Sequence, residues 1–404
     1  KTSLVWKAYE EEPILYFFVA RKAESDLCED YQSEIENKLG IPTIGRAERF
    51  ADVFEFLMKF SAERPITLFI DEFQEFFRVN KSVYSDMQRI WDMYNPKARI
   101  NLIVCGSIYS LMTKIFKNKK EPLYNRQTRF MTVRPFTPTV LKEILAEYRP
   151  DYTAEDLLAL YAFTGGVAKY VQLLVDAGAT TKADMLDHIV KADSIFLGEG
   201  KAILIEEFGK DYGIYFSILS AIARGKTSRS EIENVVGRQI GGYLTKLESE
   251  YEVISKRQPL FEKSSSKNVR YTIEDNFFTF WFRFIYKYSN MLEIENYGSV
   301  KTIIDRDYET FSGLMLERWF KRVLTEQKAY TRIGGWWDRK GENEIDIVAE
   351  NELDDAATFF EVKRKTENID MAKLETKAAA FLRVTEAFRG YALSYKGLSM
   401  DDML

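Results

Sequence analysis

Two carboxylates follow directly on a short apolar run in the first quarter of this sequence. Residues 66–70 have the continuous apolar character of a buried strand, and Asp71 and Glu72 come immediately after them. Carboxylates at the end of such a strand can hold a magnesium ion and polarise a water molecule for attack on a phosphate. We therefore expect Asp71 to bind Mg²⁺ and Glu72 to be a catalytic residue. The alternative is that the two acids only mark the point where a strand meets solvent.

A phosphate-binding motif can be completed around the first two residues. A P-loop ends in lysine followed by serine or threonine at the start of a helix, where the lysine reaches the β and γ phosphates and the hydroxyl binds Mg²⁺. Lys1 and Thr2 fit these positions, and helix-compatible residues follow them. The sequence starts without methionine, so we expect the glycines of the loop to precede Lys1. With Asp71 and Glu72 as a Walker B pattern, the pair predicts binding of ATP and Mg²⁺.

A third apolar run, residues 102–105, is followed by Gly106 and Ser107. Ser107 could hydrogen-bond near the γ-phosphate as a sensor, and the alternative is a plain cap between a strand and a helix. The predicted nucleotide site therefore has two metal ligands, Thr2 and Asp71. Its full set of cofactor-binding residues is Lys1, Thr2, Asp71 and Ser107.

Charged and apolar residues alternate in two neighbouring segments near the C-terminus. Asp346 lies in the first segment, and Glu361 and Lys363 share one face of the second. Paired strands would bring the three together, which resembles the PD-(D/E)xK nuclease core: carboxylates bind Mg²⁺, and the lysine orients or deprotonates the water that attacks a phosphodiester. We expect all three to be catalytic, Asp346 and Glu361 to bind metal, and Glu317 to be a candidate further ligand. The alternatives are an amphipathic strand with a surface ion pair, or a nuclease-like fold without activity.

Four groups of elements would position these residues, which makes the chain a multidomain α/β protein. Buried strands alternate with helical patterns at first, as in a parallel sheet. Helices alone follow, then three helices with a two-stranded hairpin, and finally strands flanked by helices. The predicted domains are a P-loop core at 1–137, a helical lid at 138–206, a winged helix-turn-helix at 207–298 and an α/β restriction-endonuclease-like domain at 299–404.

The predicted winged helix carries cations where DNA-binding proteins place them. Such a module sets one helix in the major groove and its wing on the phosphate backbone. The alternative is a spacer or a module that docks a protein. The candidate recognition-helix residues are Arg238, Gln239, Tyr243 and Lys246, and the candidate wing cations are Lys256, Arg257, Lys263, Lys267 and Arg270.

Composition limits the other function classes. The net charge of the 404 residues is -5, so a DNA contact has to come from a local basic patch. The single histidine, His188, argues against His-based triads and histidine-rich metal sites. The two cysteines fit free thiols in a reducing compartment, and no run is long enough to cross a membrane. We expect a cytoplasmic protein without a membrane partner, and leave open a homo-oligomer or a protein partner.

The order of several motifs resembles the archaeal-type P-loop ATPases, a branch of the AAA-like and STAND proteins found in archaea and bacteria. Members of that family often end in a winged helix and a PD-(D/E)xK nuclease-like domain, so the resemblance covers the whole chain. Ala168 stands where family members usually have proline, and Arg126 and Arg129 fall where an arginine could face the nucleotide. The motifs that carry the resemblance are Lys1-Thr2, Phe69-Ile70-Asp71-Glu72-Phe73-Gln74, Cys105-Gly106-Ser107, Arg134-Pro135-Phe136 and Thr164-Gly165-Gly166.

Three functions of different classes are compatible with these patterns. The first is an ATPase whose nucleotide state regulates a Mg²⁺-dependent nuclease-like tail acting on DNA. The second is a STAND-like signalling or scaffold ATPase whose tail only recognises a partner or DNA. The third is a DNA-binding regulator whose nuclease-like domain clamps the backbone. The retained charged residues of both candidate sites favour the first, whereas the acidic net charge favours the second.

Overall fold

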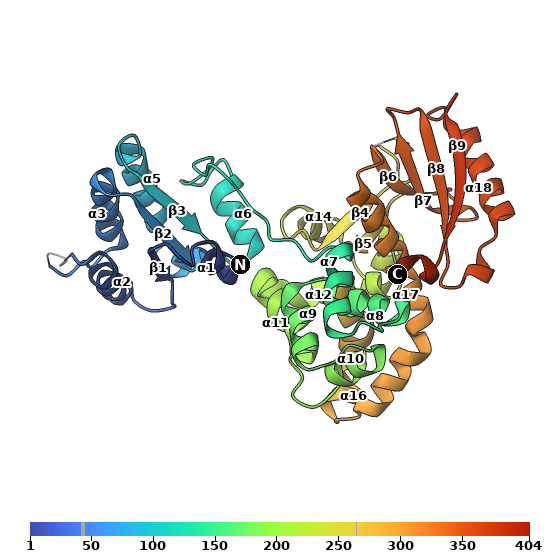
Figure 1. Cartoon of the computed structure of the whole chain (residues 1–404), viewed down its shortest axis with the longest axis horizontal. Coiled ribbons are helices and arrows are strands. Elements are labelled where there is room, and N and C mark those ends of the chain that lie inside the picture. The colour runs from blue at the N-terminus through green and yellow to red at the C-terminus, as the bar shows by residue number, and fades with distance from the viewer. Residues whose placement is uncertain (42–44, 264) are drawn as a thin grey trace. The chain divides into compact units, whose positions relative to one another are not determined.

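The computed structural model describes residues 1–41, 45–263 and 265–404. The chain divides into two units, Lys1–Val133 and Arg134–Leu404 (Figure 1). Each unit has its own hydrophobic core. In those three ranges no helix is both long enough and apolar enough to span a membrane.

The three apolar runs of the first unit form one parallel sheet. Strands β1 (Ile14–Phe18), β2 (Ile66–Asp71) and β3 (Ile100–Val104) lie in the order β1-β2-β3. Parallel neighbours need crossover connections, and helices supply them. This confirms the predicted parallel α/β sheet. The helices of the unit are α1 (Thr2–Ala8), α2 (Glu24–Leu39), α3 (Phe50–Glu63), α4 (Phe76–Val79), α5 (Val83–Tyr94) and α6 (Tyr109–Lys117).

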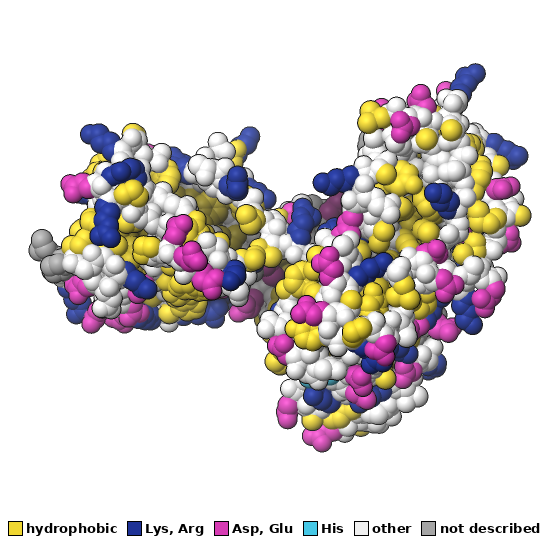
Figure 2. Space-filling model, in the orientation of Figure 1, with side chains coloured by type: hydrophobic (Ala, Val, Ile, Leu, Met, Phe, Trp, Pro, Cys, Tyr) yellow, Lys and Arg dark blue, Asp and Glu magenta, His cyan; other side chains and the backbone are white. Residues whose placement is uncertain are grey.

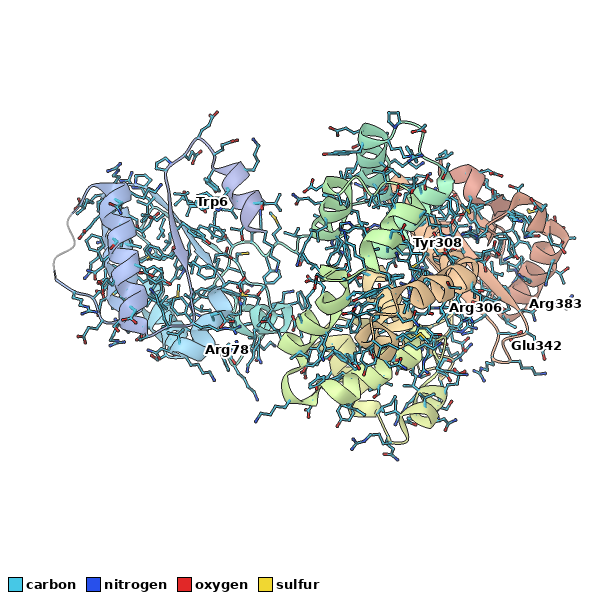
Figure 3. The ribbon with its side chains drawn as sticks, turned by 90° about the horizontal axis from the view of Figure 1, so that it is seen from below. Trp6, Arg78, Arg306, Tyr308, Glu342 and Arg383 are labelled. Carbon is cyan, nitrogen blue, oxygen red and sulfur yellow. The ribbon has the colours of Figure 1, made fainter. Side chains whose placement is uncertain are left out.

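The two faces of this sheet carry different side chains, because successive residues of a strand point to opposite sides. Leu15 and Leu68 are paired in register and belong to the core formed with α2, α3 and α5. Tyr16 and Phe69 are the next pair, and they contact Trp6 of α1, with ring centroids 5.1 and 6.4 Å from that of Trp6 (Figure 3). Helix α1 is thereby held against the sheet that ends in Asp71.

The second unit opens with helices that share one core with the long helix α17 (Tyr297–Gln327). Tyr161 and Trp319 join the two parts, with ring centroids 5.2 Å apart, and Tyr308 of α17 is almost fully buried (Figure 3). Thr153 starts one of these helices with a capping box, in which its hydroxyl and the side chain of Asp156 satisfy each other's backbone N–H groups. The opening helices are α7 (Pro138–Tyr148), α8 (Ala154–Thr164), α9 (Ala168–Asp176), α10 (Lys182–Ile189) and α11 (Ile195–Phe208).

Three helices and a hairpin come next, in the order that the sequence predicts for residues 207–298. Ser228 opens the second helix with a capping box, and Gly237 ends it in the left-handed conformation. The two strands are antiparallel, with Ile254 opposite Ile273. The elements are α12 (Tyr212–Ala223), α13 (Arg229–Val236), α14 (Gly241–Ser249), β4 (Ile254–Arg257) and β5 (Arg270–Ile273).

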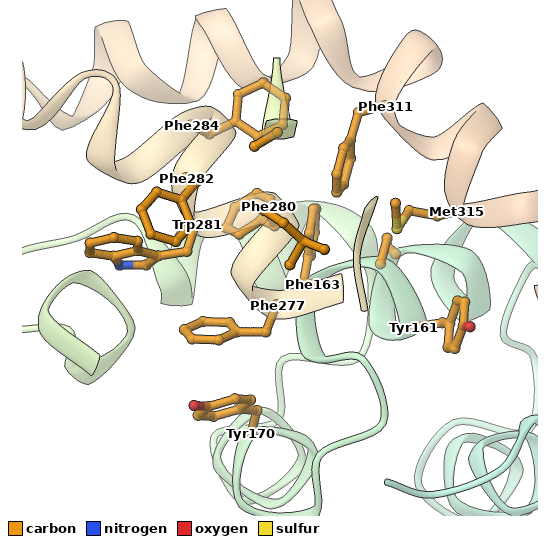
Figure 4. Close-up of a cluster of buried hydrophobic side chains, with 14 of the residues drawn as sticks. Tyr161, Phe163, Tyr170, Phe277, Phe280, Trp281, Phe282, Phe284, Phe311 and Met315 are labelled. Carbon is orange, nitrogen blue, oxygen red and sulfur yellow. The ribbon is translucent and has the colours of Figure 1, made fainter. Parts of the chain in front are cut away.

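An aromatic segment connects the hairpin to α17. Helix α15 (Asn276–Phe280) runs into a π-helical turn, Trp281–Tyr286, and the short α16 (Ser289–Glu293) follows. The side chains of this segment meet those of α8, α9 and α17 in a dense aromatic cluster (Figure 4). Gly200 of α11 lies so close to Trp281 that an added Cβ would be 2.5 Å from the indole ring. The segment is therefore helical and buried, and its second half has π geometry.

The C-terminal part of the second unit is a four-stranded sheet. Strands β6 (Arg332–Trp337), β7 (Glu344–Asn351) and β8 (Ala356–Val362) are antiparallel, and β9 (Ala392–Leu398) lies parallel to β8. Helix α18 (Met371–Val384) connects β8 to β9 and covers one face (Figure 1). Helix α17 contacts β6 and β7. The predicted C-terminal sheet is present, and the division of the second unit into three domains stays a prediction.

Candidate functional site

The carboxyl end of β2 brings together the side chains predicted to bind nucleotide and metal. Asp71 is buried, and its Oδ2 accepts a hydrogen bond from the Thr2 hydroxyl at 2.7 Å. The Tyr16 hydroxyl donates to the same oxygen at 3.4 Å. A helix start and a strand end that are 69 residues apart in sequence thus form one polar site.

Lys1 and Gly106 form the second part of this site. The Lys1 ammonium donates a hydrogen bond to the carbonyl oxygen of Gly106, beyond the end of β3. A Cβ at position 106 would be 2.3 Å from Gln74 Oε1 and 2.5 Å from Met112 Sδ, so any other residue there would require these two side chains to move. The ammonium therefore lies at the same sheet edge as Asp71.

Glu72 is held by a network of side chains at this edge. Its Oε2 accepts hydrogen bonds from Ser107 Oγ at 2.7 Å and from the amide of Gln74. Its backbone is left-handed, with φ 53°, a conformation that is uncommon for a residue other than glycine. The predicted base and the predicted sensor residue are thus in direct contact.

Burial and negative charge shift the pKa values of groups around Asp71. Burial, reinforced by Asp71, raises the pKa of Tyr16 to about 12 and that of Cys105 to about 11. Both groups are therefore neutral at physiological pH. A magnesium ion fits this donor set, because hydroxyl and carboxylate oxygens are its preferred ligands.

Arg126 has a structural role in the first unit. Its guanidinium binds Asp92 in a bidentate ion pair, with distances of 2.9 and 2.7 Å, and donates to the carbonyl oxygen of Pro122. This contact favours the structural interpretation of Arg126 over a role at a nucleotide.

The C-terminal sheet brings Asp346, Glu361 and Lys363 together, as their spacing predicts. Asp346 Oδ2 accepts from the backbone N–H of Val362 at 2.8 Å, and lies 3.5 Å from the Lys363 ammonium. Lys363 also binds Glu361 at 2.9 Å. The sequence reasoning missed Lys377 of α18, which binds the other oxygen of Glu361 at 2.9 Å. Its place beside Leu374 and Ala378, on the buried face of α18, is the signal that could have found it.

Glu317 of α17 completes the acidic part of this cluster. Loss of water around its carboxyl, together with the nearby Asp346, raises the pKa of Glu317 to about 7. Burial also raises the pKa of Asp346, although the Val362 N–H and Lys363 oppose the shift. For Glu361, the ammonium groups of Lys363 and Lys377 outweigh burial and lower the pKa. The carboxyls of Glu317 and Asp346 repel each other when both are ionised. A divalent cation between them would offset that repulsion.

The metal-binding capacity of the cluster rests on two of its carboxyls. In the described part of the chain, no three His, Cys, Asp or Glu side chains are grouped as a ready-made metal site. Asp346 and Glu317 fit a cation, because neither carboxyl has both of its oxygens bound by lysines. Both oxygens of Glu361 are bound by lysines, so a metal could reach Glu361 only by displacing one of them. The role of Glu361 as a metal ligand remains a prediction.

The hairpin predicted as a wing contacts the C-terminal sheet. Leu260 donates its backbone N–H to the carbonyl oxygen of Gly335 at 3.0 Å. Arg270 binds Glu344 at 2.7 Å and lies over the Trp337 ring, and Arg257 binds Glu274 at 3.1 Å. Two of the five wing cations are therefore used in contacts within the second unit.

Two of the three remaining wing cations line a groove of about 1210 Å³. Lys263 and Lys267 line it from the hairpin, and Arg339 and Lys340 line it from the connection between β6 and β7. On the visible surface, Lys and Arg side chains are interspersed with Asp and Glu instead of forming a continuous basic field (Figure 2). On α14 and just before it, Arg238, Gln239 and Lys246 are exposed, whereas Tyr243 packs on Tyr215. On the face that Figure 2 shows, any nucleic-acid contact would therefore be local.

Comparison with solved structures defines the class of fold. The chain is similar to the Walker-type ATPase of Pyrococcus abyssi, with a TM-score of 0.51 and 19% sequence identity, over 70% of this chain and 87% of that chain. The chain therefore shares the fold of a P-loop ATPase.

Sequence comparison identifies the family. A Methanocaldococcus jannaschii protein named as uncharacterized is 31% identical over 376 residues, which cover 90% of this chain and 80% of that protein. A second uncharacterized protein of the same organism is 34% identical over 56 residues, 14% of this chain and 54% of that protein. The DUF234 model, described as archaea bacterial proteins of unknown function, matches residues 281–377. The chain belongs to the family of the first of these archaeal proteins.

Proposed function

We propose that this protein binds and hydrolyses ATP with Mg²⁺ in its first unit, and that its nucleotide state regulates a Mg²⁺-dependent, nuclease-like site acting on DNA. The observation that carries the ATPase part is the hydrogen bond between Thr2 and Asp71, at 2.7 Å, with Glu72 adjacent in sequence. The name of the structurally similar Pyrococcus protein, a Walker-type ATPase, supports the same activity.

The proposed roles at the nucleotide site follow from the position of each side chain. Thr2 and Asp71 would hold the metal ion that neutralises the phosphate charge. Lys1, at the same sheet edge, would contact the phosphates. Glu72 would accept a proton from the attacking water, and Ser107 would keep the Glu72 carboxylate aimed at it through their 2.7 Å hydrogen bond.

At the C-terminal site the proposed reaction is hydrolysis of a phosphodiester. Asp346 would hold the metal ion, with Glu317 beside it and Glu361 joining once a lysine moves away. Lys363 bridges Asp346 and Glu361, and this position suits it to orient the attacking water. DNA would reach the site along the groove lined by Lys263, Lys267 and Arg339. The nuclease-like and winged-helix assignments behind this step remain our proposals.

A second candidate function is a STAND-like ATPase that uses its C-terminal part for recognition alone. Two observations favour it. Lys363 and Lys377 neutralise Glu361 on both oxygens, and Arg257 and Arg270 are engaged within the unit. A site in this condition can bind a partner or a DNA backbone without cutting it.

ATP turnover in the full-length natural protein tests the ATPase proposal. We expect Glu72→Gln to keep ATP affinity and to lower kcat by about 10²–10⁴-fold, the range for loss of a general base. Glu63→Gln is the matched control, because Glu63 is an exposed residue at the end of α3. Equal turnover by both variants and the parent would remove Glu72 from the mechanism.

A further inference from the structure

A second, smaller cavity of the C-terminal unit is rich in cations. Its volume is about 270 Å³, near the lower end for ligand pockets, which suits a small group such as a phosphate. Two acids, Glu274 and Asp275, also line it. The five cations that line the cavity are Arg134, Arg257, Arg318, Lys321 and Arg322.

Only two of the five cations are paired. Arg257 binds Glu274 at 3.1 Å, and Arg318 donates to the side-chain oxygen of Asn276 at 2.9 Å. For the other three, no side-chain hydrogen bond or ion pair joins them to any residue that the structure describes. These three are Arg134, Lys321 and Arg322.

The cations around this cavity repel one another. Five cations and two acids line the cavity, so like charges lie close to one another. Burial raises the pKa of Asp275 to about 6, so this carboxyl offsets the positive charge fully only above that pH. Holding like charges together costs free energy, and an anion between them would offset that cost.

Two motifs without a role in the proposed reactions form one wall of the cavity. Phe136 donates its backbone N–H to the carbonyl oxygen of Gly166 at 2.7 Å, which fixes Arg134 and Gly165 at the cavity. Gly166 itself must be glycine, because a Cβ there would be 2.6 Å from the Phe136 carbonyl oxygen and its φ is +76°. The wall is therefore built by backbone contacts and does not depend on a bound group.

The part of the cavity that is lined by Lys321 adjoins the cluster of Asp346 and Glu317. Lys321 is one turn along α17 from Glu317, and its ammonium lies within 3.8 Å of the Cβ position of Gly335 in β6. The positive charge of Lys321 interacts electrostatically with the carboxyls of Glu317 and Asp346. A group bound in the cavity would thus lie beside the carboxyls proposed to hold metal.

We propose that the cavity lined by Arg134, Arg257, Arg318, Lys321 and Arg322 is a binding site for a phosphate group. The group is either a backbone or terminal phosphate of a nucleic-acid strand or a free phosphate compound, since guanidinium and ammonium donors recognise both. This site is additional to the nucleotide site of the first unit, and it needs neither ATP hydrolysis nor DNA cleavage.

The test is binding by the full-length protein in EDTA, where no Mg²⁺-dependent reaction runs. The first probe is a fluorescein-labelled, 5′-phosphorylated single-stranded oligonucleotide, followed by anisotropy over a range of salt concentrations. The second is inorganic phosphate, followed by the rise in Tm. Arg322→Gln and Arg134→Gln are the pocket variants. Arg134 is exposed, so its replacement should not disturb folding, and Arg383→Gln on α18 is the matched control (Figure 3).

For a strand phosphate, we expect each pocket variant to bind the oligonucleotide roughly tenfold more weakly, as for loss of one charge-assisted hydrogen bond. The slope of log affinity against log salt concentration should become shallower by about one in each pocket variant. The affinity of the control variant should stay within about twofold of that of the parent protein. For a free phosphate compound, the Tm rise caused by inorganic phosphate should shrink in the pocket variants alone. If both pocket variants match Arg383→Gln with both probes, the proposal is wrong. None of these readouts depends on whether the protein cuts DNA.

Discussion

At the residue scale, the two candidate sites hold their carboxylates in different ways. Glu72 is kept in place by neutral donors, Ser107 and Gln74, which leave its charge available to a water molecule. Glu361 is bound on both oxygens by ammonium groups. Under the proposed function, Glu72 needs no rearrangement of its neighbours to act on a water molecule, whereas Glu361 needs a lysine to move before a metal ion can reach it.

Lys363 gives the most direct residue-scale prediction for the C-terminal site. We expect Lys363→Ala to lower Mg²⁺-dependent cleavage by about 10²–10⁴-fold, because the attacking water loses the group that orients it. DNA affinity should change little, since the phosphate contacts lie elsewhere. Cleavage and anisotropy measured on the same preparations check both expectations, and Lys373→Ala on the exposed side of α18 is the control. Full cleavage by Lys363→Ala would exclude the proposed role.

Asp275 gives a prediction for the pH dependence of stability. It caps α15 by accepting the N–H of Phe278 at 3.1 Å, and burial raises its pKa to about 6 from an ordinary value of 3.8. A carboxyl with a raised pKa costs stability once it ionises, so its contribution falls as the pH rises from about 4 through 6. Asparagine caps equally well and does not ionise.

Asp275→Asn should therefore raise the stability of the second unit by up to about 3 kcal/mol at pH 7 and above, since one pKa unit corresponds to about 1.4 kcal/mol. Near pH 4 the difference should vanish. Thermal unfolding of both proteins between pH 4 and 8 measures it. A difference that is constant across that range would show that ionisation of Asp275 is not its cause.

At the element scale, the contact of α11 with the π-helical turn gives a matched pair of substitutions. Gly200→Ala should destabilise the second unit by about 1–3 kcal/mol, because the new Cβ would overlap the Trp281 ring. Gly198→Ala, on the same helix, meets nothing within 4 Å and should stabilise by up to about 1 kcal/mol. Chemical denaturation measures both. Equal effects from the two variants would contradict the packing described here.

Element boundaries were predictable where burial sets them, and less so at sheet edges. The run 66–70 is central and buried, and β2 matches it apart from the added Asp71. Strand β3 is an edge strand that begins at Ile100, two residues before the predicted start, because pairing with β2 extends it through polar Asn101. The last strand, β9, is Ala392–Leu398, and its extent is set by pairing with β8.

The side chains of the candidate sites were predictable where they lie on the strands. Period-two spacing predicts that Asp346, Glu361 and Lys363 converge, and the structure brings them together. Lys321 and Lys377 were missed, because a lysine on an amphipathic helix is ordinarily a solvated residue. Only the packing of α17 and α18 against the sheet turns these lysines toward the carboxyls.

At the scale of the whole molecule, the two units have separate cores, so they should unfold separately. We expect two transitions in calorimetry of the full-length protein. ATP with Mg²⁺ should raise the free energy of unfolding of one unit by about 2.7 kcal/mol at a ligand concentration of 100 times Kd. Only one of the two transitions, the lower or the upper, should therefore move to a higher temperature. Gly200→Ala should shift the other transition. If ATP and Gly200→Ala act on the same transition, the two units do not unfold independently.

Regulated cleavage of DNA is the central claim, and cutting of supercoiled plasmid by the full-length protein tests it most directly. The reaction would be run in Mg²⁺ or Mn²⁺, with and without ATP, beside the Asp346→Ala variant. We predict metal-dependent nicking that changes with ATP and disappears in Asp346→Ala. The absence of nicking by folded protein under every condition, or equal nicking by Asp346→Ala, would contradict the account and favour an ATPase that uses its C-terminal unit for recognition.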